Sequence, residues 1–383
     1  MTSSTAAGLV LTILAGVMSG NCMLPVKFLR SWKWENMWWV FSLLSLVVFP
    51  WGLALVLVNH LGAVYAALSP SQLLAPIAFG AGWGIAQILF GISVARLGLG
   101  IAYAIIVGIG AVLGTLVPLV AAQHNAVNSR ALALVLAGVV AMVLGIAITA
   151  WGGHLKDQIK DQPSQAGRSP FERSRYPAAI LLAVFCGFLA PMLNYSFAFA
   201  QDIALQAVAL GNSRYLAAYS VWPVGLAGGF LPNAAYSLYL LSRGRSWSAF
   251  RAPFPDLLWS SLMAILWMGA FALYGMSTAF LGTLGTSVGW GLFQIFMIMT
   301  ATLSGVLTGE WRKAPGRAKL FLCTGLVLLI IATLFFTFGN AHYYRSHKPR
   351  LTHSCLFASG HHGPTVDTFE RERCSLVSVL SRV

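Results

Sequence analysis

The stretch WGIAQILFGISVARLG at residues 83–98 recurs, without a gap, as WMGAFALYGMSTAFLG at residues 267–282. The two copies share the frame W-x2-A-x2-L-x-G-x-S-x-A-x-L-G, which gives eight identities in sixteen positions. Such a match indicates an internal duplication. Chance similarity is the alternative, because a background rich in glycine, alanine and leucine inflates identities.

The chain around these copies is strongly apolar. Of its 383 residues, 58% are hydrophobic and only 9% are charged, and the mean hydropathy is +0.76. Apolar runs of about twenty residues recur along the chain, and a helix of that length crosses a ~30 Å hydrocarbon core. The runs lack the alternation of period two that β-barrel strands show. The sequence therefore predicts an all-α polytopic membrane protein, because helices satisfy their own backbone groups in lipid.

Ten spans are predicted, at residues 6–26, 37–58, 73–95, 99–122, 131–151, 177–200, 215–241, 257–280, 285–308 and 319–338. The two copies of the repeat lie in the third and eighth spans, and an offset of five spans inverts the second copy in the bilayer. The predicted fold is therefore ten transmembrane helices as two inverted five-helix repeats, an arrangement that many secondary transporters use. The predicted parts are a first repeat at 1–151, a linker at 152–176, a second repeat at 177–338 and a disordered tail at 339–383.

Lysine and arginine are unevenly distributed between the two faces of the predicted bundle. Loops after the odd-numbered spans hold sixteen of these residues, whereas the other loops between spans hold only Arg130 and Arg214. Because basic residues in short loops stay cytoplasmic, the odd-numbered loops and the linker are predicted inside and both termini outside. Most of the net charge of +14 then determines topology in the lipid bilayer, and no nucleic-acid partner is expected.

Ionisable chemistry is scarce in the predicted spans. The chain has ten acidic residues, and none lies near the centre of a span. His60, His124 and His154 fall in loops, and the five cysteines are scattered without the spacing of a zinc site. An enzyme acting on membrane substrates would need such side chains to meet around a cavity. We therefore expect no enzymatic activity, no metal site and no cofactor.

The spans instead contain amides, hydroxyls and aromatic rings. This combination suits a small neutral sugar, because amides both donate and accept hydrogen bonds while apolar sugar faces pack on rings. The candidate substrate-binding residues are Asn21, Trp83, Gln87, Tyr103, Asn194, Trp290 and Gln294. The alternative for each is a structural role, since intramembrane amides also hold helices together and tryptophans anchor at the membrane interface.

Two pairs of these candidates share a spacing. Trp83 with Gln87, and Trp290 with Gln294, each place an indole and an amide one turn apart on one helix face. They occur in the similar stretches GWGIAQI and GWGLFQI, which are offset by 207 residues, whereas the duplication runs at an offset of 184. We interpret the two stretches as the same local pattern, a Trp and a Gln on one glycine-flanked helix face. In this interpretation the pattern arose separately in the third and ninth spans, and the stretches are not copies of one segment.

Three further stretches carry a family resemblance. They are LPVKFLRSWKWENMWWVFS at 24–42, FGAGWGIAQILFGISVARLGLG at 79–100, and GEWRKAPGR after the ninth span. In these stretches the chain resembles the L-rhamnose/proton symporter family, a branch of the drug/metabolite transporter superfamily, over residues 6 to about 338. The resemblance implies ten helices in two inverted halves and proton-driven uptake of L-rhamnose across a bacterial cytoplasmic (inner) membrane.

The same resemblance suggests which carboxylates couple transport to protons. Glu35 and Glu310 match the family's W-E and E-W positions, and Asp202 is a third candidate. The alternative for the two glutamates is ion pairing with neighbours such as Lys33 or Arg312.

The leading hypothesis is a secondary active transporter that takes up L-rhamnose or a related neutral sugar with a proton, by alternating access. One alternative is a metabolite or drug exporter of the same superfamily. Another, from a different functional class, is a membrane enzyme or sensor that transports nothing.

Overall fold

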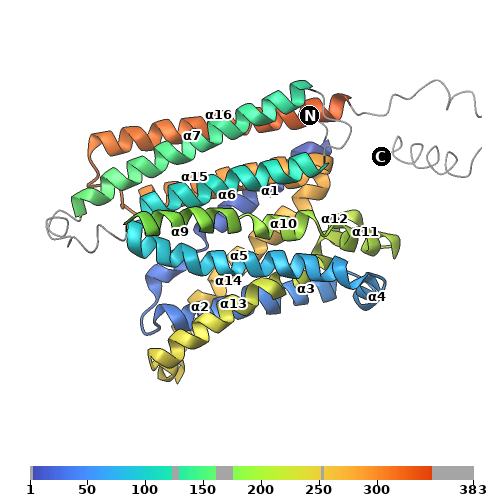
Figure 1. The fold of residues 1–383 in the computed structure, drawn as a ribbon, viewed down its shortest axis with the longest axis horizontal. Coiled ribbons are helices and arrows are strands. Elements are labelled where there is room, and N and C mark those ends of the chain that lie inside the picture. The colour runs from blue at the N-terminus through green and yellow to red at the C-terminus, as the bar shows by residue number, and fades with distance from the viewer. Residues whose placement is uncertain (1–2, 123–128, 161–175, 252–253, 347–383) are drawn as a thin grey trace, which may run out of the picture.

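The computed structural model describes residues 3–122, 129–160, 176–251 and 254–346, and this part of the chain is helical without strands (Figure 1). The first half contains α1 (Ser3–Asn21), η1 (Leu24–Phe28), α2 (Trp34–Leu43), η2 (Leu44–Val48), α3 (Phe49–Leu57), α4 (Leu61–Ala66), α5 (Pro70–Leu97), α6 (Leu99–Ala122) and α7 (Ser129–Lys160). The second half contains α9 (Tyr176–Leu189), α10 (Met192–Ala198), α11 (Gln201–Ala209), α12 (Arg214–Ala217), η4 (Ala218–Ser220), α13 (Trp222–Arg243), η5 (Ser246–Arg251), α14 (Phe254–Leu281), η6 (Gly282–Leu284), α15 (Gly285–Leu307) and α16 (Gly316–Ser346).

Nine stretches of the described structure are long and apolar enough to cross a membrane. The longest has 54 residues and contains both α14 and α15, which the short η6 separates. The expected multi-pass helical architecture is thus confirmed, and the eighth and ninth expected spans correspond to separate helices within one apolar stretch. Three other expected spans are irregular: a π-helical turn, η2, joins α2 to α3, Pro191 separates α9 from α10, and η4 lies between α12 and α13.

Two helices run on beyond the ends expected from hydropathy. α7 continues past residue 151 to Lys160, and α16 continues past residue 338 to Ser346. Hydropathy marks where the lipid ends, but the helix need not stop there: α7 continues through Leu, Lys and Gln, which are good helix formers in water as well, whereas most residues of the α16 extension are weaker helix formers. The rest of the expected linker and the expected disordered tail, residues 161–175 and 347–383, lie outside the described residues.

The two helices that contain the copies of the repeat each end at a glycine with a positive φ. α5 and α14 are both 28 residues long, and each is followed by a glycine in the left-handed region, Gly98 at φ 81° and Gly282 at φ 71°. Glycine is required there because a Cβ disfavours that conformation. The two glycines occupy the last position of the aligned repeat, so the sequence match extends to the backbone turn.

The helices of the two halves pack on one another reciprocally. α1 packs on α14 and α15 of the other half, and α9 packs on α5 and α6. Likewise α13 packs on α5 and α2 on α14, while α6 contacts α15 and α7 lies along α16 (Figure 1). The closest approach is between α5 and α13, where a Cβ added at Gly80 would meet the carbonyl oxygen of Gly225. Small residues permit such backbone contact in membranes, where packing holds helices together.

The bundle has two chemically distinct ends. The basic end, which is defined here by residues 22–33, 244–251 and 308–315, carries most lysines and arginines of the described connections. The opposite end is formed by residues 58–69, 199–221 and 282–284. In Figure 1 the basic end lies on the left and the opposite end on the right.

Candidate functional site

A continuous series of contacting aromatic rings crosses the interior between the halves. Trp83 of α5 stacks on Trp267 of α14, with ring centroids 5.4 Å apart and planes at 26°. Tilted ring contacts continue the series through Phe271 at 4.4 Å, Phe293 at 5.3 Å and Trp290 at 5.7 Å, each measured from the preceding ring. We call these five residues the aromatic ladder. It joins the two tryptophans that the sequence singled out, although they lie on helices of different halves.

The middle of the ladder contains a residue that the search for site residues missed. Trp267 was not among the candidates, yet it is the position that the internal repeat aligns with Trp83. The two indoles are 7% and 6% exposed and lie face to face near the centres of α5 and α14. The alignment was therefore the available signal, because equivalent positions of inverted repeats can meet on the axis that relates them.

The two amides next to the ladder have unused hydrogen-bonding capacity. Gln87 is half-buried and Gln294 is 8% exposed, and neither side chain hydrogen-bonds within the described part of the chain. Such amides are available to a polar ligand or to water.

The contact between α6 and α15 contains two more buried groups without partners. They are Trp290 Nε1 and Thr115 Oγ1, for which no hydrogen bond exists among the residues that the structure describes. The Trp290 indole fills the space above Gly114, where any side chain would collide with it. Thr115 follows Gly114 on α6, and Gln294 lies one turn beyond Trp290. Polar groups without hydrogen-bond partners therefore lie together at the Trp290 end of the ladder.

Asn194 differs from Gln87 and Gln294, because both polar atoms of its side-chain amide already form hydrogen bonds. Its Nδ2 donates to the carbonyl oxygens of Gly114 and Thr286, at 2.8 and 2.9 Å, and its Oδ1 accepts from the Tyr274 hydroxyl at 2.6 Å. It is completely buried. It thereby ties α10 to α6, α14 and α15, which favours the structural role that the sequence left open.

Asn21 and Tyr103 lie away from the ladder. Asn21 sits at the basic end of α1, donates to the Val17 carbonyl at 2.9 Å and accepts from the Ser304 hydroxyl of α15. Tyr103 packs edge-on against Phe90, with centroids 6.4 Å apart. The structure thus brings Trp83, Gln87, Trp290 and Gln294 to the ladder and leaves the other three candidates in separate surroundings.

The three carboxylates predicted for proton coupling also lie apart from one another. Glu310 forms an ion pair with Lys27, and Glu35 accepts from the Ser246 hydroxyl at 2.6 Å, both at the basic end. Asp202 accepts from the Gln72 amide at 2.9 Å at the opposite end. The partner in this ion pair, Lys27, lies 283 positions from Glu310 in the sequence. With 46% and 40% of their side chains exposed, this pair contributes only about 0.2–1 kcal/mol.

Asp256 is the one buried acid among the described residues, and it was not a candidate. It is 1% exposed, and its carboxylate accepts the backbone N–H groups of Arg30, Ser31 and Trp32 at 2.8, 2.7 and 2.8 Å. Charge-assisted bonds of this kind are about twice as strong as neutral ones. Asp256 at the start of α14 therefore fixes the connection between α1 and α2 of the other half.

Polar contacts join the two halves at both ends of the bundle. At the basic end these contacts include the Asp256 bonds, the Lys27–Glu310 pair, and a hydrogen bond of 2.9 Å that Asn36 Nδ2 donates to the Ser246 carbonyl oxygen. At the opposite end Asn59 and Asn212 exchange two bonds, at 2.6 and 3.0 Å, and Tyr65 donates to the Ser220 carbonyl at 2.8 Å. Asn36 and Asp256 are 0% and 1% exposed, and the bonds of Asp256 are charge-assisted, so the basic end is held more firmly. In the described structure no group of three or more His, Cys, Asp or Glu side chains is placed to hold a metal ion.

Comparison with known proteins gives a consistent result across the membrane body. Residues 1–342 match the family described as L-rhamnose-proton symport protein (RhaT). A protein named L-rhamnose-proton symporter from Klebsiella pneumoniae (strain 342) is 28% identical over 339 residues, covering 86% of this chain and 96% of the relative. One of the same name from Escherichia coli O17:K52:H18 (strain UMN026 / ExPEC) is 27% identical over 338 residues, with the same coverage. These relatives are transporters, not enzymes, and the chain belongs to the L-rhamnose-proton symport protein family.

Proposed function

We propose that this protein is a secondary active transporter that takes up L-rhamnose or a related neutral sugar together with a proton, across a bacterial cytoplasmic membrane. Its relatives carry the name L-rhamnose-proton symporter, which supports the sugar and the coupling ion. The observation that carries the proposal is the pair of amides, Gln87 and Gln294, at an aromatic ladder between the halves. Rings stack on the apolar faces of a sugar, and free amides bind its hydroxyls.

The substrate site in this proposal lies at the ladder. Trp83 and Trp290 supply ring faces, while Gln87 and Gln294 supply donors and acceptors from α5 and α15. Asn194, which has no free hydrogen-bonding group, holds the surrounding helices in place. No charged side chain belongs to the ladder, and this suits a neutral ligand better than an ionic one.

The two halves, residues 1–151 and 177–338, act in this proposal as inverted five-helix repeats. The reciprocal packing of α1 on α14 and of α9 on α5 supports a twofold relation between them. The stacked pair Trp83 and Trp267 and the matching turns at Gly98 and Gly282 support it further. Rocking of one half against the other would expose the ladder alternately to each side.

The proposed orientation places the basic end in the cytoplasm and both termini outside, because basic connections stay inside. Proton coupling in this scheme acts on contacts between the halves. Glu310 is the first choice, since protonation would leave Lys27 without its anionic partner and weaken the basic end, which must open to release sugar inside. The pair's ~1 kcal/mol at most corresponds to a shift of about fivefold in a conformational equilibrium.

The test is uptake of a panel of radiolabelled sugars by cells that lack their own rhamnose carrier and express this protein. We expect saturable uptake of L-rhamnose that unlabelled L-rhamnose and closely related neutral sugars compete away. Uptake indistinguishable from that of cells carrying an empty vector would contradict the proposal. A lower steady-state level of a neutral sugar than in those cells would instead support the exporter alternative.

A further inference from the structure

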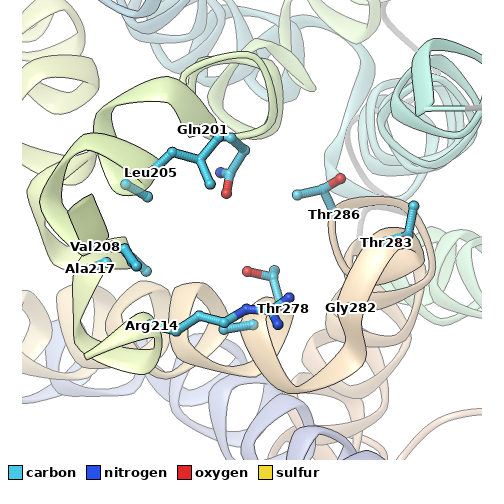
Figure 2. Close-up of a pocket in the computed structure, with 12 residues that line it drawn as sticks. Gln201, Leu205, Val208, Arg214, Ala217, Thr278, Gly282, Thr283 and Thr286 are labelled. Atoms are coloured by element: carbon cyan, nitrogen blue, oxygen red, sulfur yellow. The ribbon is translucent and has the colours of Figure 1, made fainter. Parts of the chain in front are cut away.

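A cavity of about 270 Å³ lies at the opposite end of the bundle, away from the ladder residues (Figure 2). Its walls come entirely from the second half, with α11 and α12 on one side and the junction of α14, η6 and α15 on the other. Typical ligand pockets for drug-sized molecules measure ~300–1,000 Å³, so this cavity is suited to something as small as a monosaccharide.

The polar side of the cavity offers both donors and acceptors. Gln201 uses its Nε2 to donate to the Phe197 carbonyl at 2.7 Å, which leaves its Oε1 free to accept. Thr278 donates to the Gly275 carbonyl at 2.7 Å and keeps its oxygen lone pairs. Figure 2 shows Gln201 reaching into the open space from above, and Arg214 extended toward Thr278 below it. Such a mixture matches a ligand whose hydroxyls both donate and accept.

Arg214 is the one charged residue of the lining, and it has no ion pair or hydrogen bond with any residue that the structure describes. Its guanidinium presents several N–H donors in a fixed planar fork. The short helix that carries it is held in place by its neighbour Tyr215, whose ring stacks on Phe280 of α14 at 4.1 Å. Arg214 therefore has a fixed base and a free head group at the cavity.

Apolar side chains lie next to Gln201 on the same helix, α11. Leu205 and Val208 of α11 line the cavity, and their side chains are 65% and 38% exposed. A ligand that fits this lining has hydroxyls and a hydrocarbon edge, as a deoxysugar with a methyl group does. A simple inorganic anion would use Arg214 but leave the apolar side chains uncovered.

The cavity also touches the part of the fold that ends the repeat. Gly282, the glycine in the left-handed region, lines it together with Thr283 and Thr286. The Thr286 carbonyl accepts from Asn194, whose Oδ1 is bonded to Tyr274, and the Tyr274 ring lies 5.8 Å from that of Trp290. A ligand in the cavity thus contacts the turn between α14 and α15. Through Asn194 this turn is connected to the Trp290 end of the aromatic ladder.

We propose that this cavity is an outward-facing sugar subsite, in which Arg214, Gln201 and Thr278 bind hydroxyls and Leu205 and Val208 cover an apolar edge. The sugar occupies it before it reaches Gln87 and Gln294. This inference rests on the proposed function and on the orientation given there, and it assigns binding to residues outside the ladder.

The first arm of the test measures sugar uptake by whole cells with the full-length chain. Arg214→Ala removes the fork of donors, and Arg214→Lys keeps the charge without the fork. We expect the KM for L-rhamnose to rise about tenfold in Arg214→Ala, as loss of a charge-assisted hydrogen bond implies, and by a smaller factor in Arg214→Lys. The maximal rate stays near that of the wild type. Arg130→Ala is the control, because it removes the same charge at the same end but outside the cavity.

The second arm measures binding without relying on transport. Val208→Cys places a thiol in the cavity, and Ala67→Cys places one on the exposed surface at the same end. We expect a membrane-impermeant maleimide to label both above the wild-type background, and L-rhamnose to slow labelling of Val208→Cys alone. D-mannitol, a hydroxyl-rich compound without a ring or methyl group, is expected to give no protection.

The outcomes separate the two proposals. Wild-type uptake of L-rhamnose with an unchanged KM in Arg214→Ala and no protection of Val208→Cys would overturn the subsite and leave the proposed function standing. Lack of sugar uptake by the wild type would overturn both. A raised KM in Arg214→Ala together with selective protection of Val208→Cys would support the subsite.

Discussion

The contacts of Asp256 lead to a quantitative prediction about stability. Asp256→Asn keeps the size of the side chain but removes its charge and one of its two acceptor oxygens, both of which accept backbone N–H groups of residues 30–32. At least one buried N–H then loses its partner, and the bonds to the remaining oxygen lose their charge assistance. Hydrogen bonds to charged groups contribute about 1.5–3 kcal/mol each, so we expect a loss of about 3 kcal/mol.

A loss of this size is measurable as a fall in unfolding temperature. The unfolding entropy grows by about 2.1 cal/mol/K per residue, so a chain of 383 residues loses about 1.2 °C per kcal/mol, and we expect a fall of about 4 °C for the purified protein in detergent. Asp202→Asn is the matched control. Its carboxylate is exposed and accepts a single side-chain bond, from Gln72, so its loss is expected to stay within about 1 °C. Equal unfolding temperatures for the two variants would refute the assignment of Asp256 as the firmer contact between the halves.

Three further predictions concern the ladder, the coupling and the packing. Gln87→Ala and Gln294→Ala are each expected to raise the KM for L-rhamnose about fivefold to tenfold at normal membrane abundance, because sugar hydroxyls lose a partner; wild-type kinetics in both would remove the amides from the site. Glu310→Gln is expected to abolish accumulation driven by a proton gradient while sugar counterflow continues, and unchanged accumulation would exclude it from coupling. Gly80→Ala is expected to reduce the yield of folded protein severely, since its Cβ would meet a backbone carbonyl of α13, whereas Gly91→Ala has open space and should match the wild type in gel filtration.

The helical architecture was largely readable from the sequence, for a physical reason. Apolar runs must be helical in lipid, so the expected spans correspond to helices. Helix ends were harder to predict, because α7 and α16 extend past the apolar runs into residues that hydropathy does not mark as helix. The π-helical turn at η2 was not expected, although Ser45 within it and Pro50 just after it are residues that can disturb a helix.

The candidate site was readable only in part. Trp83, Gln87, Trp290 and Gln294 were found from their spacing, and the structure places them at one ladder. Asn194 has the same type of side-chain amide, but its Nδ2 donates to the carbonyl oxygens of Gly114 and Thr286. In the sequence these two residues lie 80 and 92 positions from Asn194. Partners that distant are set by packing, which no local pattern reveals.

Asp256 and Arg214 were not identified as candidate residues from the sequence, because their surroundings depend on the packing of the chain. The partners of Asp256 are backbone N–H groups, which every residue except proline possesses and which therefore leave no trace in the sequence. Arg214 stood out only as one of two basic residues in the even-numbered loops, and its place in a cavity depends on where α12 meets η6. The match over residues 1–342 shows the family, but pairwise identity of about 28% does not transfer the role of such residues.

The central claim is that sugar and proton enter together, and the most direct measurement is the external pH of a lightly buffered suspension of cells that express this protein and lack their own rhamnose carrier. On addition of L-rhamnose we predict a prompt rise in external pH, which a protonophore abolishes and which cells with an empty vector do not show. Uptake of labelled L-rhamnose without any change in external pH would contradict symport with protons.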